Sequence, residues 1–503
     1  MIIMVVSLLC MDLPHLRREA HSGRLPVEQL LEIIDKQQQT IQGFRRENQR
    51  LRERLAQYEP EVGSAASSPK PNAQTPASSY SLAAEEKRRR RKRRRRKKSP
   101  GRRPTELKVA DAERQENIYP EGIRRADCQL VRQRAIWRLE NGRAVLVGYR
   151  IFAGPSGAEP RIPGVTPRCE YGIEILVVLA FLVYIIGISL DKACAVLTFF
   201  CQLPLAKSQA DALLRQLARH WEREFDILCA LIAQAAVAYL DDTGWKVGAQ
   251  SCSLWAVASE LERVFLFGCH KDDDTLDQLL PPDVFDGIAV TDDAAVFRGR
   301  FTQAQKCWAH LLRKAIRLAL LYPRKKKYQR FLDRLLELYY DAKRIAKDGR
   351  LGEAGRKHRI ADLEDRLCKL CRPYQWQNTR GMKPHERDFT NLVNELVRLL
   401  LAEELFTFVL EPDVESTNNS SERRLRGPAQ DRKAGRTNKT ATGAHRRSVI
   451  VSVLESLRAN LKEFNLTTVL EEVGRWMKEG ISLFARRWQA LMGTEPATIP
   501  NTS

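Results

Sequence analysis

The sequence predicts a multidomain protein of mixed α/β class, and three observations support that prediction. The chain has 503 residues, room for about two to four domains, and 43% of them are hydrophobic, the balance of a chain that folds. A heptad pattern near the N-terminus predicts an α-helical coiled coil, and the segment after it has the composition of a linker. Strand-like and helix-like patterns then follow one another from residue 121 onward.

The chain carries a large positive charge. Its 84 Lys and Arg residues outnumber 62 Asp and Glu residues, which gives a formal net charge of +22. One uninterrupted basic run, Lys87–Lys98, supplies 12 of these charges, and removing those 12 from +22 still leaves +10 on the rest of the chain. Charge of this sign makes a polyanion the first partner to consider.

Cysteine usage and hydropathy favour a reducing cytoplasm and no membrane anchor. The 11 cysteines are mostly isolated and too sparse for a secreted disulfide scaffold. Cys368 and Cys371 form a C-x-x-C that could hold zinc, but no second pair accompanies it, so an amphipathic helix is the favoured interpretation. The uncharged stretch 175–190 is shorter than the roughly 20 residues that span a bilayer, which favours a buried helix.

Residues 25–58 are expected to form the coiled coil. Mostly apolar residues recur there at spacings of four and three, among them Leu51 and Leu55. Asn48 falls at an a position, where a buried amide favours two strands. A single amphipathic helix packed on its own domain is the alternative. We expect self-association into a homodimer or higher oligomer through this segment.

Residues 59–120 are expected to form a disordered linker that contains the basic run. Its first part is rich in Pro, Ser and Ala and cannot bury enough apolar surface to fold. The basic run could neutralise many phosphates and give salt-dependent affinity without base readout. Side chains expected to do so include Arg88, Arg93 and Lys97. A localisation signal or a solvated tail is the alternative.

Residues 121–233 are expected to form a small β hairpin followed by helices. Polar and apolar residues alternate over 134–152 around Asn141-Gly142, a dipeptide typical of hairpin turns. Two short helices are then expected over 190–220, joined by a tight turn around Pro204, at a spacing compatible with a helix-turn-helix. DNA contact by these helices and a solvated face both remain open.

Acidic residues stand at the ends of two strand-like runs. The run 235–240 ends in Asp241 and Asp242 and is expected to turn at Gly244, and a later run ends in Asp292 and Asp293. Because strand side chains alternate between faces, only one acid of each pair can point to a shared site. With a helical Glu, three carboxylates could hold two Mg²⁺ or Mn²⁺ ions about 3.5 to 4 Å apart for phosphodiester chemistry. Caps and turns are the alternative role for such acids.

Four short motifs follow one another along the chain: LDDTGW at 240–245, VTD at 290–292, KCWAHLLRK at 306–314 and NNSSERRLR at 418–426. Their ordered combination resembles the DDE transposases of the insertion-sequence-66 family. The resemblance implies a ribonuclease-H-like α/β fold in which Asp241, Asp292 and Glu422 are catalytic and bind the metal ions. The family usually has a cysteine-paired zinc region, whereas Cys128 and Cys169 are isolated here, so we carry over no zinc ligands.

Glu422 also has a structural interpretation, because Asn419-x-x-Glu422 resembles a capping box at a helix start. With the other motifs present, the catalytic role is favoured. Basic side chains beyond it suit phosphates near the scissile bond, although a solvated face is the alternative. Those expected to contact DNA are Arg423, Arg426, Arg432, Lys433 and Arg436.

The resemblance also sets the remaining expected boundaries. Residues 234–311 and 405–465 would form the ribonuclease-H-like catalytic domain. The stretch between Asp292 and Glu422 is longer than such a core needs, so 312–404 would be an all-helical insertion. Residues 466–503 would form a C-terminal helix and tail.

The expected function follows from the resemblance and the acids together. The protein would be a transposase that cuts and joins double-stranded DNA at the ends of its own mobile element and at the target. Water and then a 3′ hydroxyl would be the nucleophiles. The alternative is a catalytically inactive DNA-binding or element-regulating relative. The expected location is the bacterial cytoplasm, at the nucleoid.

Overall fold

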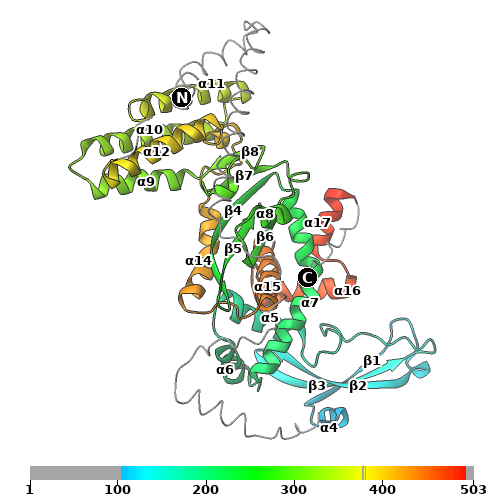
Figure 1. Ribbon diagram of the computed structural model, residues 1–503. Helices are drawn as coiled ribbons and strands as arrows, with labels where there is room; N and C mark the ends of the chain where they lie inside the picture. Colours follow the sequence, from blue (N-terminus) through cyan, green and yellow to red (C-terminus); the bar gives the residue numbers. More distant parts are fainter. Residues whose placement is uncertain (1–102, 376–378, 380, 494–503) are drawn as a thin grey trace, which may run out of the picture. The chain divides into compact units, whose positions relative to one another are not determined.

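The computed structural model describes residues 103–493 apart from 376–378 and 380, and it describes only the backbone of 420–422 and 424 (Figure 1). The expected coiled coil, the linker up to residue 102 and the basic side chains in it lie outside the described residues. The described part contains two β-sheets and many helices, a mixed α/β fold as expected. None of its helices has both the length and the apolar character needed to cross a membrane.

A three-stranded sheet comes first along the described chain. Its strand order is β1 (Arg114–Ile118), β3 (Arg143–Ala153), β2 (Gln129–Glu140), with β1 parallel and β2 antiparallel to β3. The expected hairpin joins β2 to β3 through Asn141 and Gly142. Their φ angles of 50° and 79° are both positive, as a type I′ turn requires.

The linker was expected to reach residue 120, and that boundary was wrong. Helix α4 (Thr105–Ala110) and strand β1 already lie within 103–120. Val109 of α4 is buried, and β1 pairs along its whole length with Val147–Ile151 of β3. This pairing is a tertiary contact, which the polar composition of β1 does not indicate.

Three helices follow the first sheet. The uncharged stretch forms the buried helix α5 (Ile173–Ala180) and a π-helical turn, η2 (Phe181–Ile185). Helices α6 (Leu190–Cys201) and α7 (Lys207–Ala233) occupy the expected positions, but α7 has 27 residues and is not short. Apolar side chains of α5, α6 and α7 belong to the same hydrophobic core as the second sheet. The boundary expected at residue 233 therefore lies between two segments that share one hydrophobic core.

The second sheet has five strands in the order β6-β5-β4-β7-β8. The strands are β4 (Val237–Val247), β5 (Gln250–Ala258), β6 (Arg263–Cys269), β7 (Ile288–Thr291) and β8 (Gln303–Lys306). The first three form an antiparallel meander, whereas β7 and β8 continue the sheet in parallel from β4. Helix α8 (Asp273–Leu279) connects β6 to β7 as expected. The sequence did not predict β8, because three of its four residues are polar, although two of these, Gln305 and Lys306, are buried.

Strand β4 is longer than the sequence indicated. It continues through Asp241 and Asp242, and the chain turns at residues 248–249, so the expected turn at Gly244 was wrong. A Cβ atom at Gly244 would lie 3.3 Å from Arg432 Nη1. The glycine therefore permits the close approach of another chain segment within a strand.

The remaining helices all follow the second acid motif in sequence. They are α9 (Trp308–Leu321), α10 (Lys326–Lys347), α11 (Glu353–Cys371), α12 (Pro384–Leu401), α13 (Thr407–Leu410), α14 (Asn419–Lys433), α15 (Ala441–Asn460), α16 (Leu466–Glu479) and α17 (Leu483–Met492). Helices α9 to α12 pack against one another, and α14 runs along β4 (Figure 1). Cys368 and Cys371 lie in α11, which confirms the helical interpretation. The C-terminal part has two helices where one was expected.

Helix α15 covers the edge strand β6 with a column of serines. Three backbone N–H groups of β6 donate to serine Oγ atoms at 2.9 Å each. The donor and acceptor pairs are Arg263 with Ser456, Phe265 with Ser452, and Phe267 with Ser448. The serines recur every four residues, so they lie on one face of the helix. We call this set the serine column.

Ser452→Ala should destabilise the protein, because the Phe265 N–H would stay buried without its acceptor. The expected loss is about 1 to 3 kcal/mol in the free energy of unfolding. Urea unfolding of the full-length protein measures it. Thr442→Ala, at an exposed position of the same helix, is the matched control and should change stability by less than about 0.5 kcal/mol. Equal unfolding midpoints for Ser452→Ala and wild type would contradict the expectation.

Candidate active site

Two of the predicted catalytic acids stand at the same level on neighbouring strands. β4 and β7 pair in parallel up to Tyr239 and Val290. Asp241 and Asp292 each lie two residues beyond that last pair, so strand geometry places them side by side on one face of the sheet. Both side chains are partly buried.

Buried hydrogen bonds connect the backbone next to these acids to the start of α14. The Asn418 side-chain amide donates to Leu240 O, and the Asn418 N–H donates to Cys307 Sγ at 3.1 Å. The Cys307 N–H donates in turn to Thr291 O at 2.9 Å. All four residues are buried, and Leu240 and Thr291 each immediately precede one of the two acids. We call these bonds the Asn418 network; it fixes segments far apart in sequence at one end of the sheet.

The Asn418 network places the first turn of α14 beside β4. The helix begins at Asn419, so Glu422 is its fourth residue. The N-cap residue is Asn418, whose side chain makes no capping bond and instead donates to Leu240 O. Glu422 therefore does not hold the third helical position that a capping box requires, and that interpretation was wrong. The Glu422 backbone lies about one helical turn after Asn418, the residue that bonds to β4.

The second acid of each predicted pair is engaged by basic side chains. Asp242 Oδ1 accepts from Lys271 Nζ at 2.6 Å. Asp293 forms ion pairs with Arg298 and with Arg398 of α12. These contacts agree with the expectation that only one acid of each pair can face a shared site.

A buried lysine lies next to Asp292. Lys306 on β8 is 1% exposed, and its Nζ donates to Thr291 Oγ1 at 2.9 Å and lies 3.9 Å from Glu404 Oε2. Burial lowers the pKa of Lys306, and the negative charges of Glu404, Asp293 and Asp292 oppose that shift. Lys306 is thus held at the end of β7 by Thr291, the residue that precedes Asp292.

The basic side chains predicted on α14 do not share one role. Arg423, Arg426 and Lys433 are exposed. Arg432 Nη1 donates to Gly244 O at 2.6 Å and so fastens α14 to β4. Of the four basic residues predicted to contact DNA from this helix, Arg432 is the only one that is not exposed.

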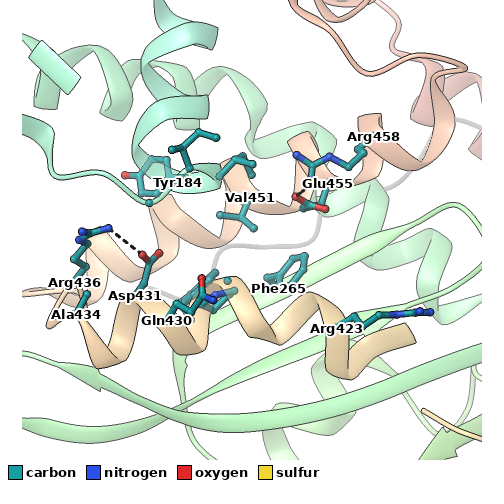
Figure 2. Close-up of a pocket in the computed structure, with 16 residues that line it drawn as sticks. Tyr184, Phe265, Arg423, Gln430, Asp431, Ala434, Arg436, Val451, Glu455 and Arg458 are labelled. Carbon is teal, nitrogen blue, oxygen red and sulfur yellow. Dashed lines mark hydrogen bonds and ion pairs between the residues drawn. The ribbon is translucent and has the colours of Figure 1, made fainter. Parts of the chain in front are cut away.

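A cavity of about 600 Å³ lies between α14 and α15 (Figure 2). Phe265 of β6 gives it an apolar wall, and Arg423, Arg436 and Arg458 give it positive charge. Arg436 points toward Asp431 in Figure 2, with Nη1 3.7 Å from Oδ1. Two arginines predicted to contact DNA therefore border a hollow next to the helix of Glu422.

Arg447 of α15 anchors the C-terminal end of α14. Its buried guanidinium donates to Asp431 Oδ2 and to Arg436 O. The guanidinium carbon lies 4.9 Å from the ring centroids of both Trp245 and Phe267. Burial lowers the pKa of Arg447, and the Asp431 carboxylate opposes that shift. Arg447 thereby joins α14 to α15 and to the sheet.

The donor chemistry at the sheet end fits a divalent metal ion. Asp241 and Asp292 supply neighbouring carboxylate oxygens, the hard ligands that Mg²⁺ prefers. A backbone N–H orients one oxygen of each at 2.9 Å: Asp242 N–H for Asp241, and Ala294 N–H for Asp292. Among the side chains that the structure describes, which do not include Glu422, no group of three or more His, Cys, Asp or Glu could hold a metal.

Three residues of this site were not predicted. Asn418 belonged to a recognised motif, and its position one turn before Glu422 was the available signal. Lys306 also belonged to a recognised motif, at 306–314, although the motif does not show that it is buried. Arg447 is buried too, but it lies outside the four motifs and had no signal in the sequence.

Comparison with known proteins gives the class. The family model described as Transposase IS66 family matches residues 168–446, more than half of the chain, and this stretch contains both strand acids and the Asn418 network. No curated protein matches the chain. This match defines the class of the protein as a transposase. The chain belongs to the IS66 family of transposases, as the motifs indicated.

Proposed function

We propose that this transposase is a metal-dependent DDE enzyme with a ribonuclease-H-like catalytic domain. The strand order supports this: three antiparallel strands continue into two parallel ones, with the first acid on the central strand β4 and the second after its neighbour β7. Residues 234–311 and 405–465 form this domain in the proposal. Helices α9 to α12, within 312–404, are its insertion.

Asp241, Asp292 and Glu422 are the proposed catalytic residues and ligands of two Mg²⁺ or Mn²⁺ ions. Such ions activate a water or a 3′ hydroxyl and stabilise the leaving oxygen of a phosphodiester. The task of the protein is to hold the three carboxylates in fixed positions. The Asn418 network supports that task, because it ties Asn418 to the backbone beside Asp241 and, through Cys307, to the backbone beside Asp292.

Double-stranded DNA is the proposed substrate, both at the element ends and at the target. The net charge of +22 supports contacts with phosphates. The proposed contacts are Arg88, Arg93 and Lys97 in the basic run and Arg423, Arg426, Lys433 and Arg436 at α14, whereas Arg432 holds β4. A dimer through 25–58 would bring two element ends together in the bacterial nucleoid.

The observation that carries the proposal is the Asn418 network, which brings the two strand acids and the helix of Glu422 to one place. The test incubates the full-length protein with a duplex that carries the inverted repeats flanking its gene, with Mg²⁺ or Mn²⁺. We expect metal-dependent nicks that leave 3′ hydroxyls at the element end, followed by joining to target DNA. Tight binding of the end duplex without any metal-dependent cleavage would overturn the proposal and favour the inactive, element-regulating alternative.

A further inference from the structure

The turn after β7 is fastened to helix α12 by charge. Arg398 Nη2 of α12 lies 2.5 Å from Asp293 Oδ1. Arg298 Nη2 lies 3.1 Å from Asp293 Oδ2 and 3.2 Å from the Asp293 carbonyl oxygen. The Asp293 side chain is 12% exposed, so this carboxylate is largely enclosed by the groups that bind it. Asp293 thus binds two guanidinium groups. One belongs to Arg298 in its own turn, and the other to Arg398 of α12, 105 residues further along the chain.

This ion pair acts on the backbone that carries Asp292. Asp293 directly follows Asp292, and Ala294 N–H donates to Asp292 Oδ1 at 2.9 Å. On the other side of Asp292, Thr291 is fully buried at the end of β7. Asp292 is therefore restrained by the sheet on one side and by the bond from Asp293 to Arg398 on the other.

We propose that Asp293 and Arg398 are positioning residues that hold Asp292 in its ligand orientation by tying its turn to the helices α9 to α12. The inference rests on the proposed function, in which Asp292 binds metal. Residues that orient a metal ligand without binding the metal are typically worth about 10- to 100-fold in metal affinity or activity. Helices α9 to α12 then help to hold the proposed metal ligand Asp292 in position.

The same helix offers a matched control. Glu395 of α12 pairs with Lys314 of α9 at 2.6 Å, with side-chain exposures of 12% for Glu395 and 49% for Lys314. The corresponding values are 12% for Asp293 and 40% for Arg398. Glu395→Gln therefore removes an ion pair of similar burial from α12, but one that connects two helices and leaves the turn after β7 intact.

The first measurement is single-turnover cleavage of an end duplex as a function of Mg²⁺ concentration, with the full-length protein. Asp293→Asn and Arg398→Gln should each raise the Mg²⁺ concentration for half-maximal cleavage by about tenfold or more. The double variant should need no more Mg²⁺ than the more impaired single variant, because both substitutions remove the same bond between Asp293 and Arg398. Arg398→Lys should recover part of the loss, and Glu395→Gln should match wild type. A wild-type Mg²⁺ dependence in both test variants would overturn the inference.

A second measurement needs neither metal nor cleavage. The Ala294 amide reports on the Asp292 carboxylate that accepts its hydrogen bond. Its hydrogen exchange should accelerate in Asp293→Asn and Arg398→Gln but not in Glu395→Gln. If the wild-type protein binds ends without cutting them, the proposed function fails and exchange alone decides the positioning role. Unchanged exchange in both test variants would overturn that role.

Discussion

Asp241→Asn, Asp292→Asn and Glu422→Gln will each reduce strand cleavage by at least about a thousandfold, with binding of an end duplex close to wild type. Each change keeps the size of the side chain and removes the charge of a proposed metal ligand. A thousandfold loss corresponds to about 4 kcal/mol of transition-state stabilisation. Binding should survive, because its main electrostatic contribution comes from basic residues that these changes do not touch.

Cleavage on denaturing gels and binding titrations at one fixed salt concentration, with the same duplex, separate the two effects. Asp242→Asn is the matched control. Strand alternation turns the side chain of this neighbour away from the face of Asp241, and its Oδ1 accepts from Lys271 Nζ at 2.6 Å. It should retain most of the activity. If Asp242 proved indispensable and Asp241 did not, the assignment of the acids on β4 would be wrong by one residue.

Arg447→Met should cost about 3 to 5 kcal/mol in the free energy of unfolding, the largest stability effect we expect from a single change. The substitution removes the buried partner of Asp431, which is 7% exposed, and leaves it only Arg436, whose side chain is 40% exposed and lies 3.7 Å away. It also removes a cation that lies 4.9 Å from the ring centroids of Trp245 and Phe267. Urea unfolding of the full-length protein measures the loss.

The double variant Arg447→Met, Asp431→Asn tests the cause. Removing both charges should recover much of the stability that the single change loses, since an unpaired buried charge is the main cost. If the double variant is as unstable as Arg447→Met, packing around the guanidinium explains the loss and the charge pair does not. Cleavage should fall together with stability in the single variant, because Asp431 anchors the helix of Glu422.

The sequence was sufficient to locate most elements and the two acids on the sheet. Strand-like runs identified β4 and β7, and Asn141-Gly142 identified the first hairpin, because these patterns are local. The prediction of a turn at Gly244 was wrong for a physical reason. A glycine predicts a turn by its backbone freedom, whereas here it is needed for the space that Arg432 occupies.

Local sequence patterns could not predict how the residues of the site are arranged. Asn418, Cys307 and Thr291 are joined by side-chain and backbone bonds across more than 100 residues, and no periodicity encodes such contacts. Strand β8 was missed because its buried residues include Gln305, whose side-chain amide finds a backbone partner at Leu405. A polar residue is recognised as buried only when its partner is known.

The serine column has a consequence for interrupted forms of the gene. A product that ends before Ser448 lacks all three acceptors of β6 and the helix that covers it. Its sheet then has an open edge with unpaired N–H groups beside apolar side chains, a template for pairing with another such edge. We expect these shortened products to aggregate and to be removed by cellular proteolysis. They would then not accumulate as competitors of the intact transposase, even where both acids of the sheet are encoded.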